Sequence, residues 1–178
     1  WVEAGPGRAP AYDVLLFEDG VPDRYFGDIA RLFVIGDEDM PMGDLEYEPT
    51  AETAETVKRR FEQTADHVER VTVVAQHRPT GRLVAFSELV VVGTVTDTLQ
   101  TTLTVVDRDH RGHALGKWIK GVAILRGIER YPEAVRLTTE NAVTNAPMLG
   151  INDLVGFVPR YEMIDYQIKV EDVLVRMS

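Results

Sequence analysis

The chain has 178 residues, which suits one domain with a sizeable core and leaves little room for two. Apolar residues make up 44% and charged residues 27%, a balance typical of folded globular proteins. The 29 acidic and 19 basic residues give a net charge of −10, which disfavours nucleic acid and anionic membranes as partners. No apolar run approaches the roughly 18 residues that span a bilayer. The absence of cysteine excludes disulfides, thiolate metal sites and a cysteine nucleophile, and we expect a cytoplasmic protein.

The first ten residues have the composition of a linker. Residues 5–10 read Gly-Pro-Gly-Arg-Ala-Pro, and Gly and Pro in such combinations interrupt regular structure. We therefore expect a linker or tail over 1–10 and one domain over 11–178. Because the sequence opens on Trp1 rather than Met, we also expect a piece of a longer chain, its C-terminal half.

The first third of the domain predicts one strand and two helices. Loose alternation over 11–18 indicates a strand, and apolar residues at helical spacing over 22–35 predict an amphipathic helix. Six carboxylates fall within 37–48, where Pro and Gly residues indicate a loop. A polar helix is expected over 50–70.

The remainder predicts a sheet with one crossover helix. Two apolar runs, 71–77 and 83–92, flank an Arg-Pro-Thr-Gly turn that is typical of a hairpin. The apolar period becomes helical over 113–129. The other expected elements are strands over 98–106, 135–139 and 160–170 and a helix over 146–154. Three antiparallel strands that lead into a crossover helix predict a mixed α/β domain.

The most informative segment is the turn before this crossover helix. Residues 107–114 are mostly charged or small, and such a turn exposes successive backbone N–H groups at the positive end of a helix dipole. A pyrophosphate fits such a site, because Gly112, Ala114 and Gly116 allow close approach to the backbone. Lys117 adds positive charge. An ordinary helix start explains the same residues, but the Walker and dinucleotide-binding spacings are absent.

Two motifs resemble the GNAT superfamily of acyl-CoA N-acyltransferases. Residues 111–116, Arg-Gly-His-Ala-Leu-Gly, are similar to the pyrophosphate motif Q/R-x-x-G-x-G/A, with Ala114 in place of the usual middle Gly. Residues 138–157 resemble the region of the same proteins written T-x-N-A-x-x-N-x-x-M followed by N-x-x-x-GF. The resemblance covers residues 70–170 and extends to the C-terminal halves of tandem GNAT proteins. It implies the GNAT fold, an α/β structure with a mixed, mostly antiparallel sheet flanked by helices.

The resemblance also implies where acetyl-CoA, or another acyl-CoA, would bind. Backbone groups at the end of the third expected strand would pair with the pantetheine arm. Amides of the turn would hold the pyrophosphate, and three asparagines would line the gap beside the arm. These residues are Thr104, Val105, Val106, Arg111, Gly112, His113, Ala114, Leu115, Gly116, Lys117, Asn141, Asn145 and Asn152. Helix capping and turn formation are alternative roles for the asparagines. No metal is expected.

GNAT enzymes generally join amine and thioester in one ternary complex, with a base for the amine and an acid for the departing sulfur. Strand parity places Glu88 among apolar residues, which raises a carboxyl pKa and suits a base. An ion pair is its alternative role, and Glu140 is a weaker candidate. Many GNAT enzymes carry an acid Tyr where this chain has Asn152. Tyr161 remains as the candidate acid, with core packing as its alternative role.

The acidic residues over 37–48 suit a small cationic amine acceptor, although a solvated charge run explains them too. His110 and His113 are expected to be anion contacts or loop residues. The expected function is N-acetyltransferase. The alternative is a non-catalytic GNAT-fold module that binds acyl-CoA or a partner domain, because the tyrosine is missing. A preceding GNAT domain of the same chain is a candidate partner.

Overall fold

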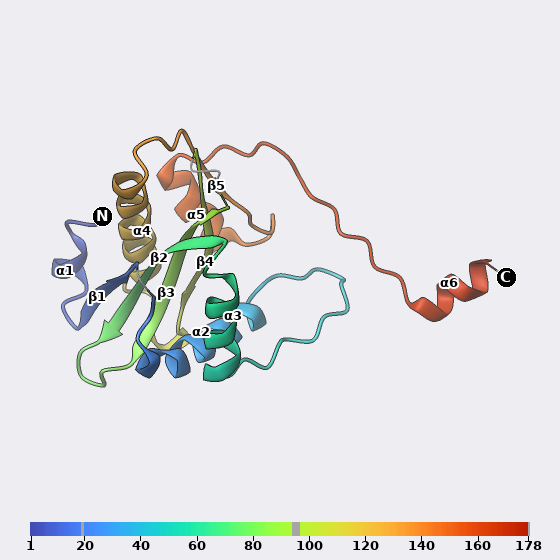
Figure 1. Cartoon of the computed structure of the whole chain (residues 1–178), viewed down its shortest axis with the longest axis horizontal. Coiled ribbons are helices and arrows are strands. Elements are labelled where there is room, and N and C mark those ends of the chain that lie inside the picture. Colours follow the sequence, from blue (N-terminus) through green and yellow to red (C-terminus); the bar gives the residue numbers. More distant parts are fainter. Residues whose placement is uncertain (19, 94–96, 178) are drawn as a thin grey trace.

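A mixed five-stranded sheet forms the centre of the molecule (Figure 1). The computed structural model describes residues 1–18, 20–93 and 97–177. Neighbouring strands follow chain order, and the first four pair antiparallel while the last pair is parallel. The strands are β1 (Tyr12–Phe17), β2 (Val68–His77), β3 (Leu83–Val92), β4 (Thr98–Val106) and β5 (Arg136–Thr139). The expected α/β class with a mostly antiparallel sheet is confirmed.

Helices cover both faces of this sheet (Figure 1). The helical elements are α1 (Gly5–Arg8), η1 (Asp23–Tyr25), α2 (Phe26–Glu38), α3 (Ala54–Thr64), η2 (Arg108–His110), α4 (Leu115–Arg130), α5 (Ala146–Val155) and α6 (Val170–Met177). One apolar cluster joins α2 and α3 to the sheet through Val74 and Phe86, and the other joins α4 to it through Val73 and Leu89.

Local sequence explains the main elements. Thr53 begins α3 with a capping box, in which its hydroxyl accepts from the Thr56 N–H at 3.2 Å. The β2–β3 hairpin closes through a bond from the His77 N–H to the Arg82 carbonyl at 2.9 Å, and Gly81 takes a φ of +68° in the turn. A Cβ on Gly127 would lie 2.8 Å from Leu89, so this glycine lets α4 pack directly onto β3.

Two sequence predictions of secondary structure are wrong. The helix expected over 50–70 ends at Thr64, because β2 already begins at Val68 and pairs with both of its neighbours. The strand expected over 160–170 is not formed: residues 157–169 have neither helix nor strand, and α6 follows. A strand requires a neighbour for its backbone bonds, and this segment runs away from the sheet (Figure 1).

The N-terminal segment expected to be a linker contacts α4 instead of lying free of the domain. Gly5 and Ala9 are buried, and a Cβ on Gly5 would lie 2.2 Å from the Trp118 ring. The short helix α1 therefore depends on a glycine at the point where it meets the indole. Within the described residues, no helix has the length and apolar character needed to cross a membrane.

Candidate cofactor-binding and active site

An open groove begins where β4 and β5 stop pairing. The last pair is Thr101 with Thr139, and β4 continues to Val106 with no strand from the described residues on its β5 side. Five residues of extended chain correspond to about 16 Å of strand edge. The backbone of Thr104, Val105 and Val106, which the sequence assigned to the pantetheine arm, belongs to this stretch of β4, and the Val106 carbonyl already accepts from Arg111 Nε at 3.1 Å. A linear amide-containing ligand could pair there as an added strand.

The turn after β4 presents a run of unpaired backbone donors. Among the described residues, the N–H groups of 112–117 have no hydrogen-bond acceptor, and the first paired amide is that of Trp118, which donates to the Ala114 carbonyl at 3.0 Å. Gly112 and Ala114 have φ values of +84° and +57°, in the left-handed region. The resulting concave turn, at the N-terminus of the 16-residue α4, is suited to a pyrophosphate.

Gly116 sets the distance between this helix and the groove. A Cβ at Gly116 would lie 3.4 Å from Val106, 3.8 Å from Thr104 and 3.8 Å from Ile151. The start of α4 is thus packed against both β4 and α5, and a larger side chain would push the free amides away from the strand edge.

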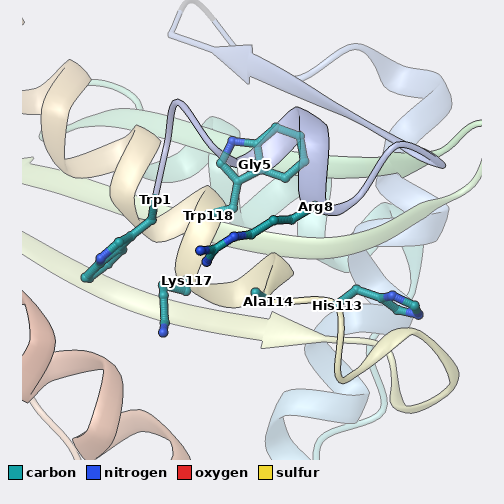
Figure 2. A pocket seen from close by; sticks show the side chains of 7 residues that line it. All are labelled: Trp1, Gly5, Arg8, His113, Ala114, Lys117 and Trp118. Atoms are coloured by element: carbon teal, nitrogen blue, oxygen red, sulfur yellow. The ribbon is translucent and has the colours of Figure 1, made fainter.

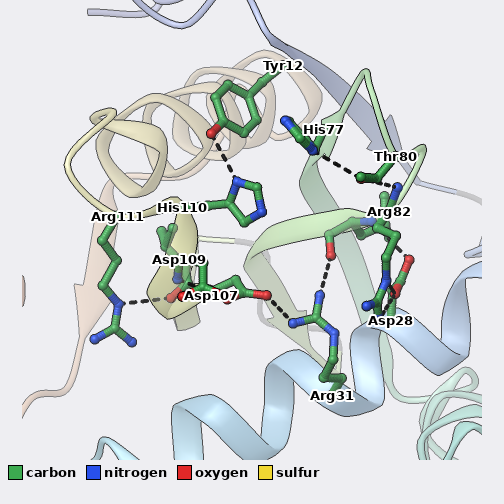
Figure 3. Close-up of polar contacts among 12 residues, drawn as sticks. Tyr12, Asp28, Arg31, His77, Thr80, Arg82, Asp107, Asp109, His110 and Arg111 are labelled. Atoms are coloured by element: carbon green, nitrogen blue, oxygen red, sulfur yellow. Dashed lines mark hydrogen bonds and ion pairs between the residues drawn. The ribbon is translucent and has the colours of Figure 1, made fainter.

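Ion pairs hold the turn against α2. Arg31 pairs with Asp107 and donates to the Leu83 carbonyl at 2.8 Å, and Figure 3 shows both contacts. The Arg111 guanidinium binds Asp39 and donates from Nε to the Val106 carbonyl at 3.1 Å. The Arg111 N–H is itself bonded to the Arg108 carbonyl at 3.4 Å, so the free amides begin one residue later than the sequence suggested.

A small hollow beside the turn carries positive charge. Trp1, Gly5, Arg8, His113, Ala114, Lys117 and Trp118 line it, and Figure 2 shows Arg8 and Lys117 near the start of α4. The Lys117 ammonium lies 5.5 Å from the centre of the Trp1 ring. These cations extend the favourable potential of the free amides toward the N-terminal segment.

The two candidate histidines lie differently from one another. His110 turns toward Tyr12, whose hydroxyl is 3.0 Å from Nδ1, and its ring centroid is 4.7 Å from that of His77 (Figure 3). Burial and the neighbouring His77 lower the pKa of His110. The His113 ring also lies near Tyr12, with centroids 5.5 Å apart, but it lines the hollow at the turn, where an anion contact remains available to it.

Glu88 is buried on the α2/α3 face of the sheet. Its side chain is 12% exposed, forms an ion pair with Arg70 (Nε to Oε1, 3.2 Å) and accepts from the Thr102 hydroxyl at 3.1 Å. The register from Ser87 to Leu89 leaves one extra residue on β4 opposite Glu88, a β-bulge of the kind often found beside active sites. Burial raises the pKa of Glu88, although Arg70 acts in the opposite direction.

The three predicted asparagines do not act alike. The Asn145 side chain accepts from the Met148 N–H at 3.3 Å and caps α5, which was its alternative role. Asn152 is 6% exposed, and its amide donates to the Asn141 side chain at 2.5 Å. The Asn152 Oδ1 in turn accepts from Lys120 at 2.8 Å. The sequence did not single out Lys120, although it lies one helical turn after Gly116 on the side of α4 that faces the groove.

Tyr161 lies outside the folded part of the molecule. It belongs to the segment that was expected to be a strand, is 71% exposed, and its hydroxyl donates to Glu140 at 3.4 Å. The structure therefore assigns it neither a core-packing role nor a contact with the groove. Glu140 is exposed and directly follows Thr139, the last residue of β5 that pairs with β4.

The carboxylates of the acidic stretch are mostly engaged within the chain. Arg108 pairs with Glu38 and Asp39, Asp37 accepts from the Thr50 N–H at 2.7 Å, and Glu46 lies 3.5 Å from Lys169. Asp37 has hydrogen bonds but no ion pair, and Asp44 and Glu48 have neither an ion pair nor a side-chain hydrogen bond among the described residues. Across all the residues that the structure describes, no cluster of three His, Asp or Glu side chains is arranged to hold a metal ion.

Comparison with known proteins supports the fold. No protein-family model and no curated protein matches the sequence. Among solved structures, the chain is similar to a tandem GNAT protein from the clavulanic acid biosynthesis pathway, with TM-score 0.64 and 24% identity over 84% of this chain and 42% of that one. It is also similar to a ribosomal-protein-alanine N-acetyltransferase from Brucella melitensis biovar Abortus 2308 (TM-score 0.63, 16% identity, 89% and 100% covered).

A third similar structure is the aminoglycoside N-acetyltransferase AAC(6')-Iy in complex with CoA (TM-score 0.59, 12% identity, 89% and 95% covered). These identities are low, so the likeness establishes the fold. The chain has the fold of GNAT acetyltransferases, as the two sequence motifs predicted. It spans less than half the length of the tandem protein and almost the whole length of the single-domain structures.

Proposed function

We propose that this protein is an acyl-CoA-dependent N-acyltransferase that transfers an acetyl group to the amine of a small cationic acceptor. The observation that carries the proposal is the run of unpaired amides at 112–117 beside the free edge of β4. A pyrophosphate and a linear amide chain are the two parts of one ligand, coenzyme A, and the two surfaces are contiguous. When bound, acetyl-CoA supplies an activated thioester.

In this proposal each part of the groove has a role. The amides of 112–117 bind the pyrophosphate, with Lys117 and His113 adding charge, and the edge of β4 at 104–106 orients the arm. The raised pKa of Glu88 and its place at the β-bulge favour it as the base that takes the proton of the amine. Asp44 and Glu48, which lack internal ion pairs, would attract a cationic acceptor.

A second candidate is a GNAT-fold module that binds acyl-CoA without turnover. The observations in its favour are the Arg70 ion pair on Glu88 and the exposed position of Tyr161, which together leave no acid–base pair of the expected kind. The two functions differ in one measurable result. An enzyme releases free CoA thiol when an amine is present, whereas a binding module does not.

The first experiment is calorimetric titration of the chain with acetyl-CoA, desulfo-CoA and ATP. We expect both CoA species to bind and ATP to bind far more weakly. Gly112→Val should abolish this binding, because a β-branched residue resists the φ of +84°. Gly81→Val is the matched control, since Gly81 also has a positive φ and open space around it but lies in the β2–β3 turn.

The outcome separates the candidates. Equal loss of affinity in both glycine variants, or no affinity in the wild type, would contradict the assignment of the turn. Release of thiol with polyamines or aminoglycosides as acceptors supports the enzyme. Binding without thiol release across such a panel supports the module.

A further inference from the structure

Lys120 is a completely buried lysine without a counter-charge. Its side chain has 0% exposure, and its ammonium donates to the Asn152 Oδ1 at 2.8 Å. The Phe157 ring centre lies 5.5 Å from Nζ. Among the described residues, no carboxylate is within ion-pair distance of it. An ammonium has three donors, so two N–H groups remain for water or for a ligand.

This ammonium lies where the groove begins. Gly116, one turn earlier on α4, packs against Thr104, Val106 and Ile151, so the same side of the helix faces β4 and α5. Asn152 follows Ile151, and its partner Asn141 comes two residues after Thr139, the last paired residue of β5. The hydrogen-bonded side chains of Lys120, Asn152 and Asn141 therefore close the end of the gap between β4 and β5 that lies next to the last pair of these strands.

The position of Asn152 adds a second argument. The resemblance to GNAT enzymes implies a tyrosine acid at this position, and here the residue is an asparagine whose side chain holds Lys120. Asn152, which stands at the position of the tyrosine, thus holds the Lys120 ammonium next to that position. Thr101, at the apex, is followed by Thr102, which contacts Glu88. Lys120 and Glu88 accordingly approach the same level of β4 from opposite faces.

We propose that Lys120 is the proton donor to the departing sulfur of the thioester. The inference rests on the proposed acyltransferase function and deepens it. The amine nitrogen bonds to the thioester carbonyl carbon, the carbon–sulfur bond breaks, and its electron pair remains on sulfur. The sulfur takes a proton from the Lys120 ammonium, which leaves free thiol and a neutral lysine amine. Glu88 takes the proton lost by the acceptor amine, and proton exchange with water that enters the groove after product release restores the Lys120 ammonium and the Glu88 carboxylate.

Electrostatics agree with this role. Burial lowers the pKa of Lys120 from 10.5 to about 8. The side chains that face it or its partner from α5 and the flanking segments are Asn152, Asn141 and Phe157, and none of them titrates. A proton donor works best when its pKa is close to the working pH, and an ordinary lysine holds its proton too tightly.

The test is the titration of the CoA thiol bound to Lys120→Met, with Lys58→Met as the control. Lys58 is an exposed helical lysine paired with Asp23 at 2.7 Å, away from the groove. Ultraviolet absorbance of the thiolate, with desulfo-CoA as blank, gives the pKa of the bound thiol. The thiol bound to the wild type or to Lys58→Met should have a lower pKa than the thiol of free CoA. The thiol bound to Lys120→Met should not. Turnover of Lys120→Met should fall about 100-fold or more.

Lys120→Arg separates positive charge from proton donation. Arginine keeps its charge and is not deprotonated in proteins, so the bound thiol should still titrate low while turnover falls. In the wild type, loss of the Lys120 proton should make turnover fall above about pH 8, the pKa of this lysine. This fall should disappear in Lys120→Arg.

A wild type that does not bind CoA overturns the proposed function and this inference with it. A wild type that binds and turns over, with the same thiol pKa and turnover in Lys120→Met as in Lys58→Met, overturns the role of Lys120 alone. If Lys120→Met fails to fold, Lys120→Arg decides: full turnover there also overturns it.

Discussion

The two faces of the sheet each bury an ionisable side chain, and the two side chains are held in opposite ways. On the α2/α3 face, Glu88 lies 3.2 Å from Arg70 and accepts from a threonine hydroxyl. On the α4/α5 face, Lys120 contacts an uncharged amide and the Phe157 ring, and no carboxylate among the described residues pairs with it. Both groups have pKa values shifted toward the neutral form by burial, but only Glu88 has a cation beside it to oppose the shift.

This difference indicates which of the two buried charges contributes to the stability of the folded state. A paired buried charge can serve the folded state alone, since its partner compensates part of the desolvation cost. An unpaired buried ammonium lowers stability and is retained where it does something else. We therefore expect the α2/α3 face to lose stability when its charge pair is broken and the α4/α5 face to gain stability when its charge is removed.

The largest expected effect comes from Arg70→Met. It leaves Glu88 buried without its cation, and breaking a buried pair in this way costs about 4 kcal/mol. Arg70 also donates to the Thr64 hydroxyl at 2.7 Å and lies over the Phe61 ring, so α3 should loosen as well. Chemical denaturation at neutral pH measures the loss.

The control for this prediction is Arg78→Met. Arg78 is exposed and pairs with the exposed Asp13 at 2.6 Å, so its removal should change stability little. Equal losses in the two variants would show that the burial of the Arg70 pair is not what matters, and the contrast between the two faces would fail on this side.

The next effect is a pH dependence that belongs to Lys120. Its pKa is about 8 in the folded state and 10.5 as the ordinary value, so between these values the unfolded chain binds more protons and stability rises with pH. The full rise is roughly 3 kcal/mol. Glu88 gives the opposite sign: its folded pKa is raised, so the stability it contributes at low pH is lost as pH rises above 4.5.

Lys120→Met should remove the alkaline rise and be more stable than the wild type at pH 7. The difference between the two unfolding free energies, measured at pH 7 and again near pH 10, isolates this residue from other titrating groups. If Lys120→Met were less stable than the wild type at pH 7, Lys120 would support the fold. The two faces of the sheet would then not differ in the way proposed.

The smallest expected change in stability comes from Asn152→Asp, which makes the two faces alike. The new carboxylate would stand 2.8 Å from the ammonium and raise the pKa of Lys120 above 8, with stability within about 1 kcal/mol of the wild type. The alkaline limit of turnover should move to higher pH. Asn145→Asp, at the cap of α5, should leave that limit in place, because aspartate caps a helix as well as asparagine does. A shift in both variants would point to a general charge effect.

Local sequence signals predicted most of the fold and part of the site. The strands β1 to β5 and the helix α4 follow apolar period and turn residues, which act over short distances. The turn at 111–116 and the helix start after it were predicted, because helix N-termini and left-handed glycines leave a pattern in the sequence, and α4 does begin at Leu115. The burial of Glu88 followed from strand parity, although its partner Arg70 on β2 did not.

The remaining features depend on contacts between distant segments. The sequence predicted a strand over 160–170, yet pairing requires a neighbour that the sequence does not specify. Lys120 was missed because a lysine on a helix ordinarily faces water, and only the close approach at Gly116 and the cover of α5 bury it. Leu125, within the segment of helical apolar period over 113–129, is exposed, because the buried side of α4 includes Lys120, Ala123 and Gly127 instead.

The short ladder between β4 and β5 has a kinetic consequence. The strands β2, β3 and β4 follow one another without an intervening helix, whereas α2 and α3 separate β1 from β2 and α4 separates β4 from β5, which makes only four pairs. Contacts between distant segments form late in folding and open early. The amide hydrogens of β5, which makes four pairs on one side, should therefore exchange with solvent before those of β2 and β3, and a ligand that spans the groove should slow that exchange.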